Sequence, residues 1–152
     1  SLDDQLDGST GETKFDKNGV AHLDGWRPPN PENRGQFRKI NGPNGTSLLF
    51  LQCDPGRSAV SWRAGAMLPK GRYRFEGRVR TQPAQAGAGM GAVLRISGAR
   101  QYQMVQGEND WTPCKYEFEV LEPVADIEAI CEVRGAGSAW FDTGSLRVVK
   151  VE

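Results

Sequence analysis

Asp142 stands directly behind two large aromatic residues, Trp140 and Phe141, at the entry to the apolar segment that ends the chain. A carboxylate in such a place can act in acid–base catalysis, hold a metal ion, or accept backbone N–H groups in a turn. The three alternatives imply different proteins, so the other chemical signals and the elements that carry them have to decide.

Signals for enzyme chemistry are few. His22 is the only histidine, and no serine or cysteine stands in a nucleophile motif beside it, which argues against a Ser/His or Cys/His hydrolase. Glu117 and Glu119 share one face of a predicted strand and would stand about 6.6 Å apart, as the carboxylate pair of a glycoside hydrolase could. The strand order derived below, however, places Glu117 and Glu119 on one of two sheets, and the expected binding groove lies on the other. We therefore expect a protein that is not an enzyme.

The composition narrows the class of partner. A chain of 152 residues is long enough for one domain with a sizeable core. Its 19 basic and 19 acidic residues give no net charge, so we expect neither a nucleic-acid nor a membrane partner. Cys53, Cys114 and Cys131 match no zinc or redox spacing and are expected to be buried thiols.

The chain pattern predicts strands. Residues 1–12 are acidic and aperiodic, and we interpret them as a linker or an expression remnant, with the domain over residues 13–152. Beyond them, segments of alternating apolar and polar residues are separated by glycine, proline and asparagine. These segments are residues 47–53, 57–64, 72–81, 91–97, 101–105, 114–120, 126–134 and 139–151. Eight antiparallel strands predict an all-β fold, a jelly-roll β-sandwich of two antiparallel sheets.

In that topology the second, fourth, fifth and seventh segments share one sheet, whose outer face could carry a groove. The residues expected to line it are Trp62, Arg95, Gln103, Glu128, Glu132 and Arg134. Tyr102 has the opposite phase from Gln103 and is expected in the core. Trp62 is ambiguous, because it also belongs to an apolar row from Val60 to Leu68 that alternation would turn inward.

Five motifs follow one another in order along most of the chain. They are "FDKNGVAHLDGW" (residues 15–26), "GTSLLF" (45–50), "LPKGRYRFEGRVRT" (68–81), "NDWTPCKYEFEV" (109–120) and "AWFDTGSLRVVKV" (139–151). Together they resemble the carbohydrate-binding modules of the family 4, 9 and 22 type, jelly rolls within the galactose-binding-like sandwiches. The resemblance implies a non-catalytic bacterial module, extracellular or at the cell surface. It would bind soluble polysaccharide or oligosaccharide chains or ends as a monomer tethered to other domains of a larger protein.

The resemblance also implies a cofactor. In that group the aspartate of the last-strand motif, here Asp142, often helps to hold a structural calcium ion together with oxygens from the first strand. The matching N-terminal residue is Asp16, although "KFDKNG" lacks the usual order of that motif. Calcium bound by Asp16 and Asp142 is therefore one expectation, and a strand-entry role for Asp142 is the other.

For the sugar site, "SWRAGAML" (residues 61–68) resembles the family 22 segment in which a tryptophan presents its ring to the ligand. Trp62 is then either a sugar platform or a core residue, with Arg95, Gln103 and Glu132 as polar partners for the sugar hydroxyls. Two alternatives stay open: a sandwich that binds a protein or spaces larger domains, and a small jelly-roll glycoside hydrolase. An exposed Trp62 favours sugar binding, and a buried one favours the interaction or spacer role.

Overall fold

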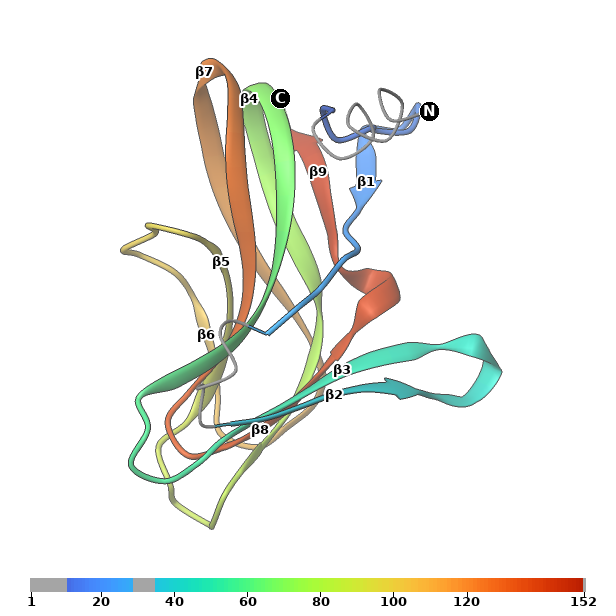
Figure 1. The fold of residues 1–152 in the computed structure, drawn as a ribbon. Coiled ribbons are helices and arrows are strands. Elements are labelled where there is room, and N and C mark those ends of the chain that lie inside the picture. Colours follow the sequence, from blue (N-terminus) through green and yellow to red (C-terminus); the bar gives the residue numbers. More distant parts are fainter. Residues whose placement is uncertain (1–10, 29–34, 152) are drawn as a thin grey trace.

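The chain is built from antiparallel strands. The computed structural model describes residues 11–28 and 35–151 (Figure 1). Its strands are β1 (Val20–His22), β2 (Gly35–Asn41), β3 (Ser47–Cys53), β4 (Ala59–Pro83), β5 (Gly91–Ile96), β6 (Met104–Gln106), β7 (Asn109–Arg134), β8 (Gly137–Asp142) and β9 (Arg147–Val151). Two short 3-10 turns, Pro43–Gly45 and Thr143–Ser145, interrupt them. In the described ranges, no helix is both long and apolar enough to cross a membrane.

The two longest strands make the sandwich. β4 and β7 pair along almost their whole length, with an irregularity in register between Pro69 and Gly71. Figure 1 shows both strands running to one end of the molecule, bending there and returning. The bend divides each strand between two facing layers, so the jelly-roll sandwich predicted from the sequence is confirmed.

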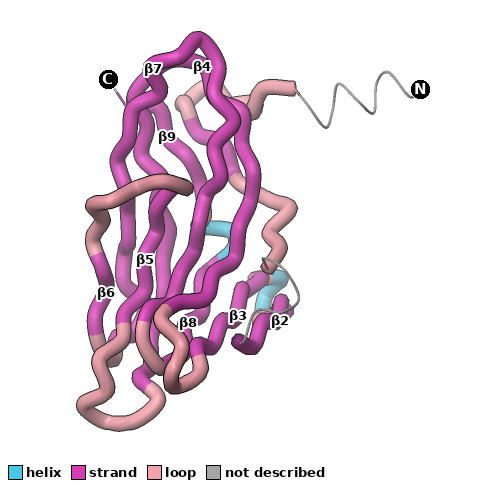
Figure 2. The backbone as a smooth tube through the Cα atoms, turned by 60° about the vertical axis from the view of Figure 1, so that its left-hand side comes forward, coloured by secondary structure: helices cyan, strands magenta, loops and turns pink. Residues whose placement is uncertain are grey.

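We call the two layers A and B. Layer A contains residues 59–69 of β4, residues 124–134 of β7, β5 and β6, side by side in that order. Layer B contains residues 109–120 of β7, residues 71–83 of β4, then β8 and β9 alongside β4, and β3 and β2 beyond β8. β1 pairs with β9 (Figure 1), and Figure 2 shows β5 and β6 side by side next to the long strands β4 and β7. The predicted distribution of segments between the sheets is therefore confirmed.

Period-two alternation fills the space between the layers. The inward side chains of layer A include Val60, Trp62 and Leu94, and those of layer B include Phe75 and Phe141; all are nearly inaccessible to solvent. Successive side chains of a strand point to opposite faces, so the polar residues between these positions are placed on the two outer faces. Cys53, Cys114 and Cys131 are buried free thiols, as predicted.

The differences from the predicted strands lie at turns and chain ends. The last predicted strand, residues 139–151, is divided into two strands in the structure, because the 3-10 turn Thr143–Ser145 separates β8 from β9. The fifth predicted segment, residues 101–105, is strand only from Met104. β1 and β2 were missed, since β1 has three residues and β2 buries little of its surface. Most of the predicted linker lies outside the described residues.

Candidate functional site

The outer face of layer A carries a row of paired arginines and glutamates, which we call the arginine–glutamate face. It consists of Arg27, Arg63, Arg95, Glu128, Glu132 and Arg134. The glutamates point outward because Ile127, Ala129, Cys131 and Val133, in the alternate positions of β7, pack in the core. The sequence pattern had placed Arg95, Glu128, Glu132 and Arg134 on this face.

The first cluster is centred on Glu128. Its carboxylate accepts hydrogen bonds from Arg63 (Nη1 to Oε1, 2.8 Å) and Arg27 (Nη2 to Oε2, 3.3 Å). Two backbone hydrogen bonds between Arg27 and Arg63, of 2.9 and 2.8 Å, hold the segment after β1 against the edge of β4. Arg63 Nε also donates to Ser61 Oγ at 3.1 Å. The Arg63 guanidinium is thus held by two side chains, and that of Arg27, which is largely exposed, by one.

The second cluster is centred on Glu132, which is only 3% exposed. Arg95 donates two hydrogen bonds to its carboxylate (Nε to Oε1, 3.1 Å; Nη2 to Oε2, 3.0 Å). Arg134 Nη1 donates a third to Oε1 at 3.1 Å. The hydrogen bond to Glu132 raises the pKa of Arg95, and the partial burial of the guanidinium opposes that effect. Such bidentate, charge-assisted pairs hold both side chains rigidly.

Neither Tyr102 nor Gln103 lies where the sequence pattern predicted. Tyr102 was expected in the core, but its half-buried ring lies 5.9 Å from the Arg134 guanidinium, beside the arginine–glutamate face. Gln103 is exposed and lines hollows with Lys115, and it is not among the described hydrogen-bond partners of Arg95 and Glu132. The reason is that residues 101–103 form a loop, in which strand alternation does not apply.

Trp62 is a core residue, so its predicted role as a sugar platform is wrong in this structure. It is 3% exposed, its indole N–H donates to Phe50 O at 2.9 Å, and Phe37 meets its ring edge-on at 5.5 Å. The apolar row from Val60 to Leu68 determines this direction. The outward neighbours of Trp62, Ser61 and Arg63, take the place on the face that the prediction had given to the indole.

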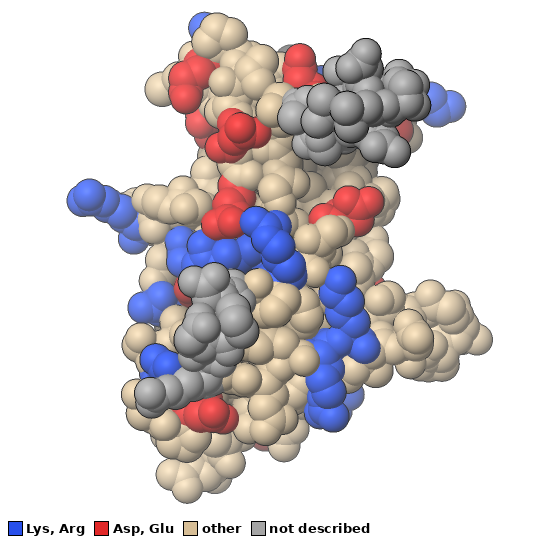
Figure 3. Space-filling view, viewed as in Figure 1, with Lys and Arg blue, Asp and Glu red and all other residues tan. Residues whose placement is uncertain are grey.

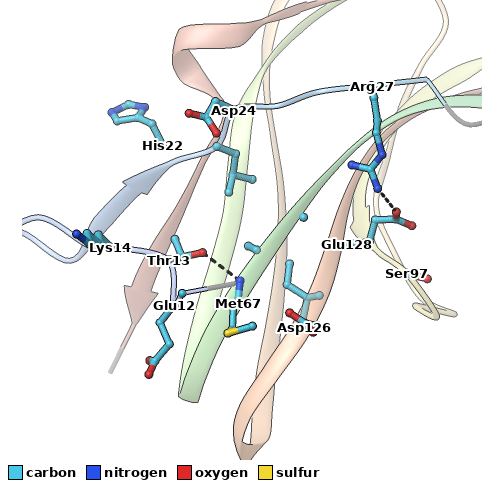
Figure 4. Close-up of a pocket in the computed structure, with 15 residues that line it drawn as sticks. Glu12, Thr13, Lys14, His22, Asp24, Arg27, Met67, Ser97, Asp126 and Glu128 are labelled. Atoms are coloured by element: carbon cyan, nitrogen blue, oxygen red, sulfur yellow. Dashed lines mark hydrogen bonds and ion pairs between the residues drawn. The ribbon is translucent and has the colours of Figure 1, made fainter. Parts of the chain in front are cut away.

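A cavity of about 740 Å³ adjoins the face at the Glu128 cluster. Figure 4 shows its wall: Glu12, Thr13 and Lys14 on the segment before β1, His22 at the end of β1, Asp24 after it, and Asp126 and Glu128 on β7. Thr13 Oγ1 accepts the Met67 N–H at 3.1 Å, and Thr13 N–H donates to Met67 O at 2.8 Å, which fastens the first segment to β4. The cavity volume is within the range of small-molecule sites.

Charges of both signs meet on this side of the molecule. In Figure 3, basic side chains form a band across the middle of the face, and acidic side chains lie next to it toward the end where β4 and β7 bend. The face and the cavity together therefore offer fixed donors and acceptors without a strong field of one sign.

Asp16 and Asp142 do not form the predicted shared metal site. The Asp16 carboxylate accepts the N–H groups of Asn18 (2.8 Å) and Val20 (3.0 Å), whereas Asp142 forms an ion pair with Arg78. Val149, the partner of Val20, pairs with Arg74, four residues or about 13 Å along β4 from Arg78. Direct ligands lie within about 2.6 Å of a calcium ion, so these two residues do not fit one ion.

Carboxylates arranged for catalysis are not apparent on the arginine–glutamate face. Glu117 and Glu119 lie opposite Arg74 and Arg72 on the outer face of layer B, away from the cavity. Both glutamates of the arginine–glutamate face are held by guanidiniums. Among the described residues, no three His, Cys, Asp or Glu side chains gather closely enough to hold a metal ion.

Two residues of this site were missed in the sequence. Arg63 could have been found by the same alternation that places Trp62 in the core, because it is the next position along β4. Arg27 follows no strand pattern; a single antiparallel bridge to Arg63 places it.

Comparison with known proteins supports the fold of the predicted family. No protein-family model and no curated protein sequence matches the chain. Among solved structures, similarity is found to a family 61 carbohydrate-binding module in complex with β-1,4-galactotriose (TM-score 0.55, 16% identity, 90% of this chain and 98% of that one). A xylanase 10B fragment of Clostridium thermocellum, a family 22 module with its catalytic module complexed with xylohexaose, gives a TM-score of 0.61 at 13% identity over 93% of this chain and 29% of that one. A family 4 module gives 0.52 at 13% identity, with 95% and 98% covered. The chain thus has the fold of the carbohydrate-binding modules that its motifs resemble.

Proposed function

We propose that the chain is a non-catalytic carbohydrate-binding module that binds a single soluble glycan chain, or its end, along the arginine–glutamate face and the adjoining cavity. The observation that carries the proposal is the pair of clusters around Glu128 and Glu132. They place four guanidinium donors in one row across layer A, around the partly exposed carboxylate of Glu128 and the buried carboxylate of Glu132.

The chemistry suits an uncharged polyol. A sugar offers hydroxyl groups that both donate and accept, and polar groups already held in position bind them without losing much side-chain freedom. Each guanidinium of the row has a carboxylate partner, and the cavity adds Glu12, Lys14, Asp24 and Asp126, so neither sign dominates. Tyr102, beside Arg134, is the aromatic ring available to pack against a pyranose. Modules of this fold in the comparisons were solved with galactotriose and xylohexaose, which supports a linear glycan as the ligand class.

The test is a glycan array on the isolated protein, followed by titration calorimetry on the strongest neutral oligosaccharide. Glu128→Gln should weaken binding about tenfold or more, because it removes the charge that fixes Arg27 and Arg63. Glu128 is partly exposed, so the variant should still fold. Glu117→Gln, on the outer face of layer B, is the matched control and should bind like the wild type. An array without any bound neutral glycan, or equal affinity of both variants, would contradict the proposal.

A second candidate, a sandwich that binds a protein or spaces larger domains, is favoured by one observation. Trp62 is buried, so the face lacks the indole platform expected of a sugar site. The array separates the two candidates, since a spacer domain binds no glycan.

The setting of the domain is part of the proposal. We infer a monomeric module attached to a larger protein, because the family 22 module in the comparisons is joined to a catalytic one. A bacterial protein outside the cell is inferred from the family resemblance of the motifs alone. Size-exclusion chromatography with light scattering would test the monomer.

A further inference from the structure

The outer face of layer B carries a second row of a different kind, which we call the arginine–aromatic row. Direct cross-strand partners place Arg80 beside Trp140, Trp140 beside Phe50, and Phe50 beside Arg38. A bulge in β7 puts Trp111 next to Arg80 at the same level, since Val79 pairs with Thr112 and Thr81 with Asn109. Five strands thus contribute to one row, which is about 19 Å long at the usual strand spacing.

The side chains of the row contact one another. Trp140 and Phe50 have ring centroids 5.3 Å apart, and the Arg38 guanidinium lies 4.9 Å from the Phe50 centroid. Arg80 lies 5.8 Å from the Trp140 ring, and Arg78 lies 5.8 Å from Trp111. Attraction between cation and ring keeps these guanidiniums over the face. The aromatic members form a fixed apolar floor, with Trp111 exposed at one end.

The charge on this row is not compensated as it is on layer A. Arg78 has Asp142 as a partner, and the nearby Asp110 carboxylate accepts the Trp111 backbone N–H. Arg38 and Arg80 form no ion pair with any side chain in the described part of the chain. A guanidinium presents a planar fork that matches a carboxylate. The row therefore combines apolar rings with two arginines that form no ion pair with the described residues.

We propose that the arginine–aromatic row is a second binding site, whose ligand is an acidic polysaccharide bearing carboxylate groups, such as a polyuronate. The rings of Trp111 and Trp140 pack against the C–H faces of the sugar above the buried Phe50, and Arg38 and Arg80 bind the carboxylates. A nucleic acid is disfavoured because the chain has no net charge and a pI near 6.6, without the basic excess that phosphate backbones select. The site is separate from the arginine–glutamate face and does not depend on the function proposed for it.

The experiment measures binding of an oligogalacturonate by titration calorimetry at low and at physiological salt. Arg38→Gln combined with Arg80→Gln should weaken it at least tenfold, and Trp111→Ala should weaken it severalfold. Both changes alter exposed side chains and should leave the melting temperature nearly unchanged. The matched control is Arg72→Gln, an exposed arginine eight residues from Arg80 along β4, which should bind oligogalacturonate like the wild type.

Two further probes decide the ligand class. Poly-L-glutamate carries carboxylates without sugar rings, and a deoxythymidine oligonucleotide carries bases and phosphates. Weak binding of both, beside clear binding of oligogalacturonate, supports the proposal. If poly-L-glutamate binds as tightly as oligogalacturonate, the row recognises carboxylates without sugar rings, which overturns the proposal. Tighter binding of the oligonucleotide would make nucleic acid the ligand and overturns it as well. So does wild-type affinity for oligogalacturonate in the double variant.

Discussion

Trp62 illustrates how one residue's place in a strand decides its role. Its ring is enclosed by the core, and its N–H is satisfied by Phe50 O. Trp62→Ala should therefore lower the free energy of unfolding by about 3–5 kcal/mol, the usual cost of removing a large aromatic from a core.

The measurement is urea denaturation, with Trp111→Ala as the control. Trp111 is 37% exposed, so its loss should cost less than about 1 kcal/mol. A Trp62→Ala protein as stable as this control would show that the indole is not a core residue in solution.

Asp142 is the residue for which a metal role and a strand-entry role make different predictions. Its carboxylate pairs with Arg78, and Ser145 Oγ donates to its backbone oxygen at 2.7 Å. If the carboxylate acts only through the exposed Arg78, Asp142→Ala should lower stability by about 1 kcal/mol or less, and Arg78→Ala should have the same effect.

Thermal melts of the wild type and of Asp142→Ala, with calcium and with chelator, separate the two roles. Calcium binding through Asp142, without Asp16 as a second ligand, stays a prediction from the family resemblance. If calcium raises the melting temperature of the wild type but not that of Asp142→Ala, calcium binding through Asp142 is established. If calcium and chelator give the wild type the same melting temperature, the role of Asp142 is its ion pair with Arg78.

At the scale of elements, Glu76 fastens β9 to β4. Arg74 Nε donates to it at 2.6 Å and Arg147 Nε at 2.7 Å. Partial burial by itself raises the pKa of Glu76, but the hydrogen bonds from Arg74 and Arg147 outweigh it and lower the pKa below its ordinary value of 4.5. The carboxylate thus stabilises the fold above about pH 4.5, and this contribution is lost as the pH falls through the lowered pKa.

Glu76→Gln should consequently be less stable than the wild type at pH 7 and should lose less stability between pH 5 and pH 3. Chemical denaturation at several pH values checks this. Glu119→Gln, whose carboxylate forms no ion pair with a described side chain, is the comparison. Parallel pH profiles for the wild type and Glu76→Gln would rule the linkage out.

Most of the elements could be predicted from the sequence because alternation is a strong signal wherever one face of a strand is buried. It gave the strand 47–53 with its observed bounds and separated the halves of β4 and β7 between layers. It failed where pairing is made by backbone groups alone. β1 is held by three residue pairs with β9, and no side-chain pattern of that length distinguishes a strand.

The site was less predictable than the fold for a related reason. Arg95 and Glu132 were found because they alternate with core residues on regular strands. Tyr102 and Gln103 were misplaced because they lie in a loop, and Arg27 was missed because a segment far away in sequence reaches β4. Direction on a strand follows from local sequence, whereas the course of a loop depends on the whole fold.

At the scale of the whole molecule, the sandwich encloses all three cysteines. Burial raises the pKa of Cys53, with a smaller contribution from Asp54, and burial also raises those of Cys114 and Cys131. Since the thiolate is the reactive form, iodoacetamide at pH 8 should label the native protein much more slowly than the protein in urea, with all three sites reacting after unfolding.

The same shifts predict a loss of stability in alkali. Because the thiol pKa is higher in the folded than in the unfolded protein, the free energy of unfolding is unaffected by thiol ionisation below pH 9.0. It falls as the pH rises above that value. Mass spectrometry of the iodoacetamide-treated protein measures the labelling of each cysteine. Thermal melts at pH 8 and pH 10 measure the loss of stability in alkali. Rapid labelling of a cysteine in the native protein would contradict its burial.

The pairing of β1 with β9 has a mechanical consequence. Val20 faces Val149 and His22 faces Arg147, so the chain enters β1 at the same end at which it leaves β9. A pull on these two points acts along the interstrand hydrogen bonds, which are perpendicular to antiparallel strands, and loads them one after another, as in opening a zipper. Once the contact of Thr13 with Met67 has broken, β1 and β9 should therefore separate at low force. Under tension the domain would yield before neighbours whose terminal strands are loaded in shear.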